Sequence, residues 1–265
     1  MPASANTPPI IILHANGTNR DRDVAWACEL AGGAPEIVHV NQLRAGERRL
    51  DDYRMLVLPG GFSYGDDLGA GALWATMLRH GLAEALQGFV ASGRPIIGIC
   101  NGFQTLVKAG LLPGVSGATP GIGPRTTTLT RNLGGHFECR WVHLAPEVNS
   151  PCVFTEGLTE PIFCPVAHGE GRFLTESEDT FAALEAGGQV ALRYVDVNNA
   201  GPAGYPANPN GSVGDVAGIC NPQGTVLGLM PHPEDHIRPE QAPHGALGGL
   251  GLTLFERGVR YSASC

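Results

Sequence analysis

Basic side chains are scarce in this sequence. Its 265 residues include 17 Lys and Arg against 25 Asp and Glu, which gives a formal net charge of −8, and Lys108 is the only lysine. The basic residues are scattered along the chain, whereas proteins that bind nucleic acids normally carry a basic patch or stripe. We therefore expect no nucleic-acid partner, and any phosphate that the protein meets should be small and local.

Paired cysteines and long apolar runs are also missing. The seven cysteines are odd in number and include no C-x-x-C pair, so neither a disulfide framework nor a zinc knuckle fits. The histidines show no paired spacing typical of metal ligands, and we expect no metal site. No basic segment precedes the first apolar run, residues 10–13, which is far too short to cross a bilayer. These features predict a cytoplasmic protein in a reducing compartment, without a membrane segment.

The composition supplies ample material for a core. Apolar residues make up 43% of the chain and charged residues only 16%, which is not typical of disorder. Short apolar runs alternate with helix-like stretches, a pattern that favours an open, mostly parallel sheet with helices on both faces. We expect a single domain over residues 1–265. The expected strands are 10–13, 37–40, 55–58 and 96–99, and the expected helices are 21–30 and 72–90.

The second half of the chain changes in character after the helix stop at residues 112–114. Residues 126–144 alternate and are rich in Thr, Phe and Trp, which is typical of a β-ribbon or of added antiparallel strands. Residues 170–180 are polar, and residues 198–214 form a long loop rich in Gly, Pro and Asn. Two further strands, 216–220 and 226–230, are expected on either side of a hairpin turn, and a last helix is expected over 247–258.

One cysteine stands where a reactive thiol would be expected. Residues 98–102 read GICNG, directly after an apolar strand and at the start of an amphipathic stretch. This is the G-x-nucleophile-x-G elbow with Cys100 as the nucleophile, and the helix N-terminus that follows favours a thiolate. The alternative is that Cys100 is a small apolar residue that closes a strand.

A base for such a thiol is found near the end of the sequence. Residues 231–234 read PHPE, directly after the strand expected at 226–230. If the chain is extended there, His232 and Glu234 lie on the same side, so that the carboxylate orients the imidazole toward the thiol. The alternative, for a histidine in a loop, is a solvated turn.

Backbone donors for an oxyanion are expected from a third segment. Residues 58–63 read LPGGFS, and a Gly-Gly turn after a strand can direct free N–H groups into the same cleft. Gly61 and the N–H of Asn101, next to the nucleophile, are the expected oxyanion hole for an attacked amide. Gly60 and Gly61 taken alone would more often form just a tight turn.

Taken together, the segments 59–61 (PGG), 98–104 (GICNGFQ) and 231–234 (PHPE) resemble the signature of class I (triad) glutamine amidotransferases, in the same order along the chain. Four further stretches resemble the glutaminase subunits of phosphoribosylformylglycinamidine synthases. They are 61–68 (GFSYGDDL), 165–172 (PVAHGEGR), 208–212 (NPNGS) and 228–230 (GLM). The resemblance covers nearly the whole chain, from Ile10 to the last helix.

The resemblance implies a flavodoxin-like fold and a hydrolysis of L-glutamine. Cys100 would attack the carboxamide, while His232, oriented by Glu234, would protonate the departing ammonia and then activate water. Gly60, Gln104 and His168 would contribute to the glutamine pocket. For His168, a histidine that bonds its own turn is an equal alternative.

The resemblance also implies a partner. The ammonia would pass to an ATP-dependent synthetase subunit that converts formylglycinamide ribonucleotide to formylglycinamidine ribonucleotide in purine biosynthesis. ATP and magnesium are expected on that partner, because the sequence has no G-x-x-x-x-G-K-[ST] loop; the sequence leaves open whether a small accessory subunit takes part. Asp235 stands where the family often has Arg, and Gly134 stands where Ser is expected.

Two other functions stay open at this point. The chain could feed ammonia to a different synthetase, although segments 165–172 and 208–212 speak against it. It could also be a non-catalytic relative with a sensor cysteine, for which His232 and Glu234 would be unnecessary.

Overall fold

The computed structural model describes residues 7–114, 123–199, 201–244 and 248–265. Most of its strands are short and apolar, and β1, β3, β4 and β11 are buried along almost their whole length. The strands are β1 (Pro9–His14), β2 (Ala34–His39), β3 (Met55–Leu58), β4 (Ile96–Ile99), β5 (Thr127–Thr130), β6 (Glu138–Pro146), β7 (Ile162–His168), β8 (Arg172–Thr175), β9 (Val190–Val195), β10 (Val216–Cys220) and β11 (Val226–Leu229).

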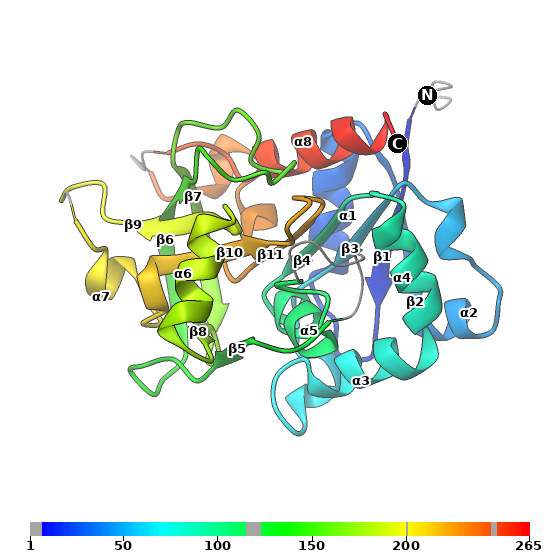
Figure 1. Cartoon of the computed structure of the whole chain (residues 1–265). Helices are drawn as coiled ribbons and strands as arrows, with labels where there is room; N and C mark the ends of the chain where they lie inside the picture. The colour runs from blue at the N-terminus through cyan, green and yellow to red at the C-terminus, as the bar shows by residue number, and fades with distance from the viewer. Residues whose placement is uncertain (1–6, 115–122, 200, 245–247) are drawn as a thin grey trace.

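Nine of these strands form one sheet in the order β2-β1-β3-β4-β11-β10-β9-β6-β7 (Figure 1). The five strands from β2 to β11 run parallel. The strands from β10 to β7 continue the sheet with antiparallel pairing. The predicted open α/β sheet is confirmed. The three predicted site segments lie at the ends of strands in its parallel part.

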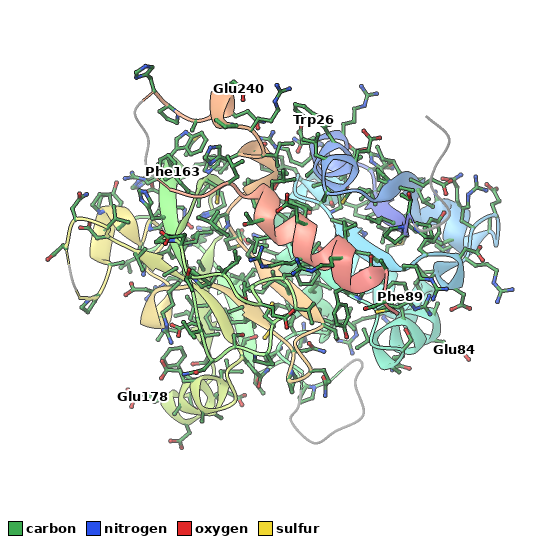
Figure 2. The ribbon with its side chains drawn as sticks, turned by 90° about the horizontal axis from the view of Figure 1, so that it is seen from above. Trp26, Glu84, Phe89, Phe163, Glu178 and Glu240 are labelled. Carbon is green, nitrogen blue, oxygen red and sulfur yellow. The ribbon has the colours of Figure 1, made fainter. Side chains whose placement is uncertain are left out.

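The helices cover both faces of the parallel half, as expected. Helix α1 packs against α8, whereas α3 packs against α4 and α5, and Figure 1 shows these two groups on opposite faces. Figure 2 shows α8 from above, next to α1, which carries Trp26. The helices are α1 (Asp21–Leu30), α2 (Val40–Arg44), α3 (Ala72–Gly81), α4 (Ala83–Ala91), α5 (Asn101–Ala109), α6 (Glu178–Ala186), α7 (Gly204–Ala207) and α8 (Leu252–Ser262).

This placement of the helices follows from the handedness of the crossovers. From β1 the chain moves through α1 to β2 on one side, and from β3 it moves through α3 and α4 to β4 in the opposite direction along the sheet. Because β-α-β crossovers are right-handed, opposite directions place the helices on opposite faces. The same arrangement brings the carboxyl ends of β3, β4 and β11 to one edge, where ligands bind in such folds.

Some predicted boundaries were wrong. The helix predicted over 72–90 is two helices, because Leu82 leaves the helical region with φ −138°. Val40 begins α2 instead of ending β2. The last helix begins at Leu252, not at Leu247, which lies outside the described residues.

The alternating stretch 126–144 contains both of the structures that its pattern allowed. Strand β5 pairs with β8 as a separate two-stranded ribbon, whereas β6 joins the main sheet between β7 and β9. The polar stretch 170–180 holds β8 and the start of α6, which is capped by the Ser177 side chain. Among the described residues, no helix is both long enough and apolar enough to cross a membrane.

Candidate functional site

Cys100 lies at a sharp turn between β4 and α5. Its backbone has φ 50° and ψ −106°, a left-handed conformation that is strained for a residue with a side chain and is typical of a nucleophile elbow. A Cβ on Gly102 would stand 1.9 Å from the Leu58 carbonyl oxygen, and one on Gly98 would stand 2.5 Å from Leu106 Cδ1. Only glycine therefore lets α5 pack this closely against β3 and β4.

The predicted base lies at the end of the neighbouring strand. Strands β4 and β11 pair in parallel register, with Ile99 opposite Leu229, so the segments that follow them emerge side by side. The backbone N–H of His232 donates to the Pro165 carbonyl oxygen at 2.8 Å, which fixes the residue against β7. The structure thus brings His232 and Cys100 to the same edge of the sheet, as predicted.

His232 and Glu234 form a buried pair. Imidazole Nδ1 lies 2.7 Å from Glu234 Oε1, and both residues are almost fully buried. The predicted extended backbone was wrong, because Pro233–Asp235 form a short 3-10 turn. The turn nevertheless brings the two side chains together, since proline at its first position fits that geometry.

The free atoms of this pair have no partner within the described part of the chain. His232 Nε2 and Glu234 Oε2 are both buried and form no hydrogen bond. Burial lowers the pKa of His232, but the Glu234 carboxylate and the Cys100 sulfur outweigh it and hold the pKa well above its usual value. A buried imidazole that readily holds a proton, with a ring nitrogen still free, can give that proton to a leaving group.

The Gly-Gly turn after β3 packs against the imidazole of the His232–Glu234 pair. A Cβ on Gly60 would meet His232 Cε1 at 2.8 Å, so Gly60 contacts the imidazole edge directly. Gly61 has φ 144°, and a Cβ there would lie 2.8–2.9 Å from backbone atoms of residues 17–19. The turn is locked to that loop by the Phe62 N–H, which donates to the Gly17 carbonyl oxygen.

Two adjoining hollows meet at the nucleophile. The larger, of about 180 Å³, includes Gln104, His168 and Glu170, and the smaller, of about 90 Å³, includes Arg20 and His232. Both are lined by Gly61, Phe62, Cys100, Phe137 and Ala167. A still larger hollow of about 600 Å³ beside α3 holds none of the predicted site residues, so size alone would have pointed to the wrong place.

Asn101 and Gln104 hold the wall of the larger hollow. The Asn101 amide donates to Asp66 Oδ1 at 2.9 Å and to Gln104 Oε1 at 3.1 Å, and its own oxygen accepts the Ser63 N–H. Gln104 Nε2 in turn donates to the Glu170 carbonyl oxygen at 2.7 Å. One turn of α5 thereby ties the loop after β3 to the loop after β7.

His168 is buried, and its ring bonds two other loops instead of its own turn. Its Nδ1 lies 3.2 Å from Asn132 Oδ1, and its Nε2 lies 3.5 Å from the Asn210 amide nitrogen. Burial lowers the pKa of His168 to about 3, so the ring is neutral at physiological pH. Asn132 also donates to the His168 carbonyl oxygen and accepts the Gly171 N–H.

Sequence reasoning missed the roles of several of these neighbours. Asn210 lies in segment 208–212, which was noted for its resemblance, whereas Asn132 lies two residues before Gly134, which was noted only as a departure. Both asparagines are far from His168 in the sequence, so their contact with it could not be seen there. Arg20 forms an ion pair with Asp235 at 3.1 Å, which gives a partner to the aspartate that departs from the family pattern. Burial and the Glu234 charge raise the pKa of Asp235 to about 6, although Arg20 acts in the opposite direction.

Comparison with known proteins places this arrangement in a family. Residues 7–262 match the family described as CobB/CobQ-like glutamine amidotransferase domain. The chain belongs to this glutamine amidotransferase family. This is a family of the kind that the segments at 59–61, 98–104 and 231–234 resembled.

Individual relatives show to which branch of this family the chain belongs. The phosphoribosylformylglycinamidine synthase subunit PurQ of Treponema denticola is 52% identical, over 96% of this chain and 98% of the relative. The subunit of the same name from Dehalococcoides mccartyi is 43% identical, over 95% of this chain and 96% of the relative. The chain thus belongs to the PurQ branch of the glutamine amidotransferases.

A solved structure supports the same placement. A chain in the structure of PurLQS from Thermotoga maritima is 33% identical and superposes with a TM-score of 0.73, over 96% of this chain and 99% of that one. The agreement extends over both the parallel and the antiparallel halves of the sheet, because the alignment covers nearly all of both chains.

Proposed function

We propose that Cys100, His232 and Glu234 hydrolyse L-glutamine to L-glutamate and ammonia. The observation that carries this proposal is the convergence of the strained Cys100 and the buried His232–Glu234 pair on one hollow, from two strands that pair in register. A thiol, a base and a group that orients the base are the parts that nucleophilic hydrolysis of an amide needs.

The chemistry proceeds in two stages. Cys100 gives its thiol proton to His232 Nε2 as Sγ attacks the carboxamide carbon, and His232 passes this proton to the nitrogen, which leaves as ammonia while a γ-glutamyl thioester stays on the enzyme. His232 then takes a proton from water, the resulting hydroxide attacks the thioester, and glutamate leaves as Cys100 regains its proton. The strongly raised pKa of His232 supports its role as the proton donor of the first stage.

Backbone N–H groups of Gly61 and Asn101 are proposed to hold the oxyanion. Gly61 lines both hollows beside Cys100. Asn101 is the first residue of α5, where the N–H groups have no partner within the helix. The side chain of Asn101 is already used to hold Ser63 and Asp66, which leaves the backbone donor as the part available to substrate.

The ammonia is proposed to serve an ATP-dependent synthetase subunit that aminates formylglycinamide ribonucleotide. The names of the relatives as subunits of phosphoribosylformylglycinamidine synthase support this partner. We assign ATP and magnesium to the synthetase, with this chain needing no cofactor of its own, because the sequence has no phosphate-binding loop of the G-x-x-x-x-G-K-[ST] type. All seven cysteines are free thiols, which supports a reducing, cytoplasmic setting.

The test is ammonia release from glutamine by the chain and by Cys100→Ala, each with and without the synthetase, ATP and formylglycinamide ribonucleotide. We expect fast release only by the wild-type chain in the full mixture. A full mixture that releases no ammonia from a folded wild-type chain would overturn the pathway assignment. Activity that persists in Cys100→Ala would overturn the role of the thiol.

A further inference from the structure

Two carboxylates lie in the larger of the two hollows at Cys100. Asp66, in the loop after β3, and Glu170, in the loop after β7, both line it. They come from segments far apart in the chain, and neither has a role in the triad. A substrate held at Cys100 would place one of its ends beside them.

The position of the leaving group determines which end of the substrate enters the larger hollow. The ammonia must leave on the side of His232, whose buried Nε2 has no partner and which lines the smaller hollow. With the carboxamide held at Cys100 between the hollows, the amino-acid end of glutamine extends into the larger one. The larger hollow, of about 180 Å³, therefore receives the α-carbon and its substituents.

The charges there favour a cation. Among the described residues that line the larger hollow, Asp66 and Glu170 are the only acidic ones, no Lys or Arg lines it, and His168 is kept neutral by burial. Lys108 lies outside this lining and donates to the Ala70 carbonyl oxygen. Burial, and secondarily the charge of Glu170, raise the pKa of Asp66, although the Gly71 and Asn101 hydrogen bonds and the charge of Lys108 act in the opposite direction. An ammonium group placed between the carboxylates would relieve this repulsion.

Both carboxylates are held in place by groups already tied to the nucleophile. Asp66, at φ 55°, accepts from the Asn101 amide, next to Cys100. Glu170 accepts the Ala70 N–H at 3.2 Å through Oε2, while Gln104 holds its backbone. Its other oxygen, Oε1, accepts no hydrogen bond within the described part of the chain. Positioned charges of this kind select a ligand group more sharply than mobile ones.

We infer that Asp66 and Glu170 recognise the α-ammonium group of glutamine and so make the site selective for the amino acid over simple amides. The inference rests on the proposed glutaminase function and names the substrate contacts of the same site. It predicts that glutaramate, which is glutamine without the α-amino group, binds poorly although it carries the same carboxamide.

The experiment measures how well each compound protects Cys100 from iodoacetamide in the isolated chain, read from the Cys100 peptide by mass spectrometry. For the wild-type chain we expect half-protection at a glutamine concentration ten- to a hundredfold lower than for glutaramate, in the range of a hydrogen bond to a charged group. In Asp66→Asn and Glu170→Gln, which keep an oxygen acceptor, this ratio should fall toward one. The matched control Asp67→Asn, on the same loop but outside the hollow, should keep the wild-type ratio.

Equal protection of the wild-type chain by glutamine and glutaramate would overturn the inference without reference to any variant. Variants that keep the full ratio would overturn it as well. Failure of the proposed function is distinguishable, because then neither compound would protect Cys100, and the complete mixture with the synthetase would release no ammonia from glutamine.

Discussion

The imidazole of His232 and the carboxylate of Glu234 meet at 2.7 Å inside a buried turn, two residues apart in the chain. The second carboxylate oxygen of Glu234, Oε2, has no hydrogen-bond partner among the described residues. The hydrogen bonding of the Glu234 side chain within the described residues is therefore to this histidine. The carboxylate both orients the ring and opposes the effect of burial on the pKa of His232.

Replacing Glu234 by Gln should lower glutaminase activity by at least about a hundredfold, because a positioned acid–base group typically contributes a factor of that size to the rate. Burial would then dominate, so the pKa of His232 should fall, and its protonated form should be lost at lower pH than in the wild-type chain. The measurement is kcat/KM for glutamine against pH in the complete mixture, whose alkaline limb should move to lower pH. Glu240→Gln, an exposed control on the same segment, should leave the profile unchanged; an unshifted limb in Glu234→Gln would contradict the assigned role.

The glycine of the elbow allows a stability prediction with an internal control. Gly102→Ala places a Cβ 1.9 Å from the Leu58 carbonyl oxygen, and because backbone cannot move aside cheaply, we expect a loss of about 3 kcal/mol or more in the free energy of unfolding. Gly88→Ala, in the middle of α4 with open space around it, should instead stabilise the chain by about 0.5–1 kcal/mol. Urea denaturation of both variants checks the contrast, and equal effects would refute the close packing of α5.

The parallel sheet and the grouping of Cys100, His232 and Glu234 at its edge could be predicted from sequence because both leave local signals. Apolar runs of four or five residues mark β1, β3, β4 and β11, and each site segment follows its strand directly. Strands β7 and β9 left a weaker signal, because Pro165 interrupts one and polar Arg193 lies in the other. The environment of His168 could not be predicted, because Asn132 and Asn210 reach it only through the folded arrangement of three loops.

Gly60 offers a variant that separates catalysis from stability. A Cβ at this position meets His232 Cε1 at 2.8 Å, and a side chain can shift where backbone cannot. We expect Gly60→Ala to unfold at nearly the wild-type temperature while kcat falls by at least about tenfold, because a small displacement of a catalytic base is costly. Thermal unfolding followed by circular dichroism, combined with glutaminase assays in the complete mixture, tests this. Full activity would show that Gly60 does not control the position of His232.

The buried His168 should make the fold sensitive to acid. Its pKa is lowered to about 3 in the folded chain, against about 6.5 for an exposed histidine. Between these two values the unfolded chain binds a proton that the folded chain does not, so stability is lost as the pH falls below about 6.5. His168→Gln should remove this contribution and lower the pH dependence of the unfolding free energy by up to about 1.4 kcal/mol per pH unit in that window.

Urea denaturation at pH 7 and pH 5 measures the effect. At pH 7 the variant should be less stable, because the contacts to Asn132 and Asn210 are disturbed, but its stability should fall less on going to pH 5. The exposed His80 supplies the control, since His80→Gln should keep the wild-type dependence on pH. If His168→Gln also keeps the wild-type dependence, the histidine titrates normally in the folded chain, and burial does not hold it neutral.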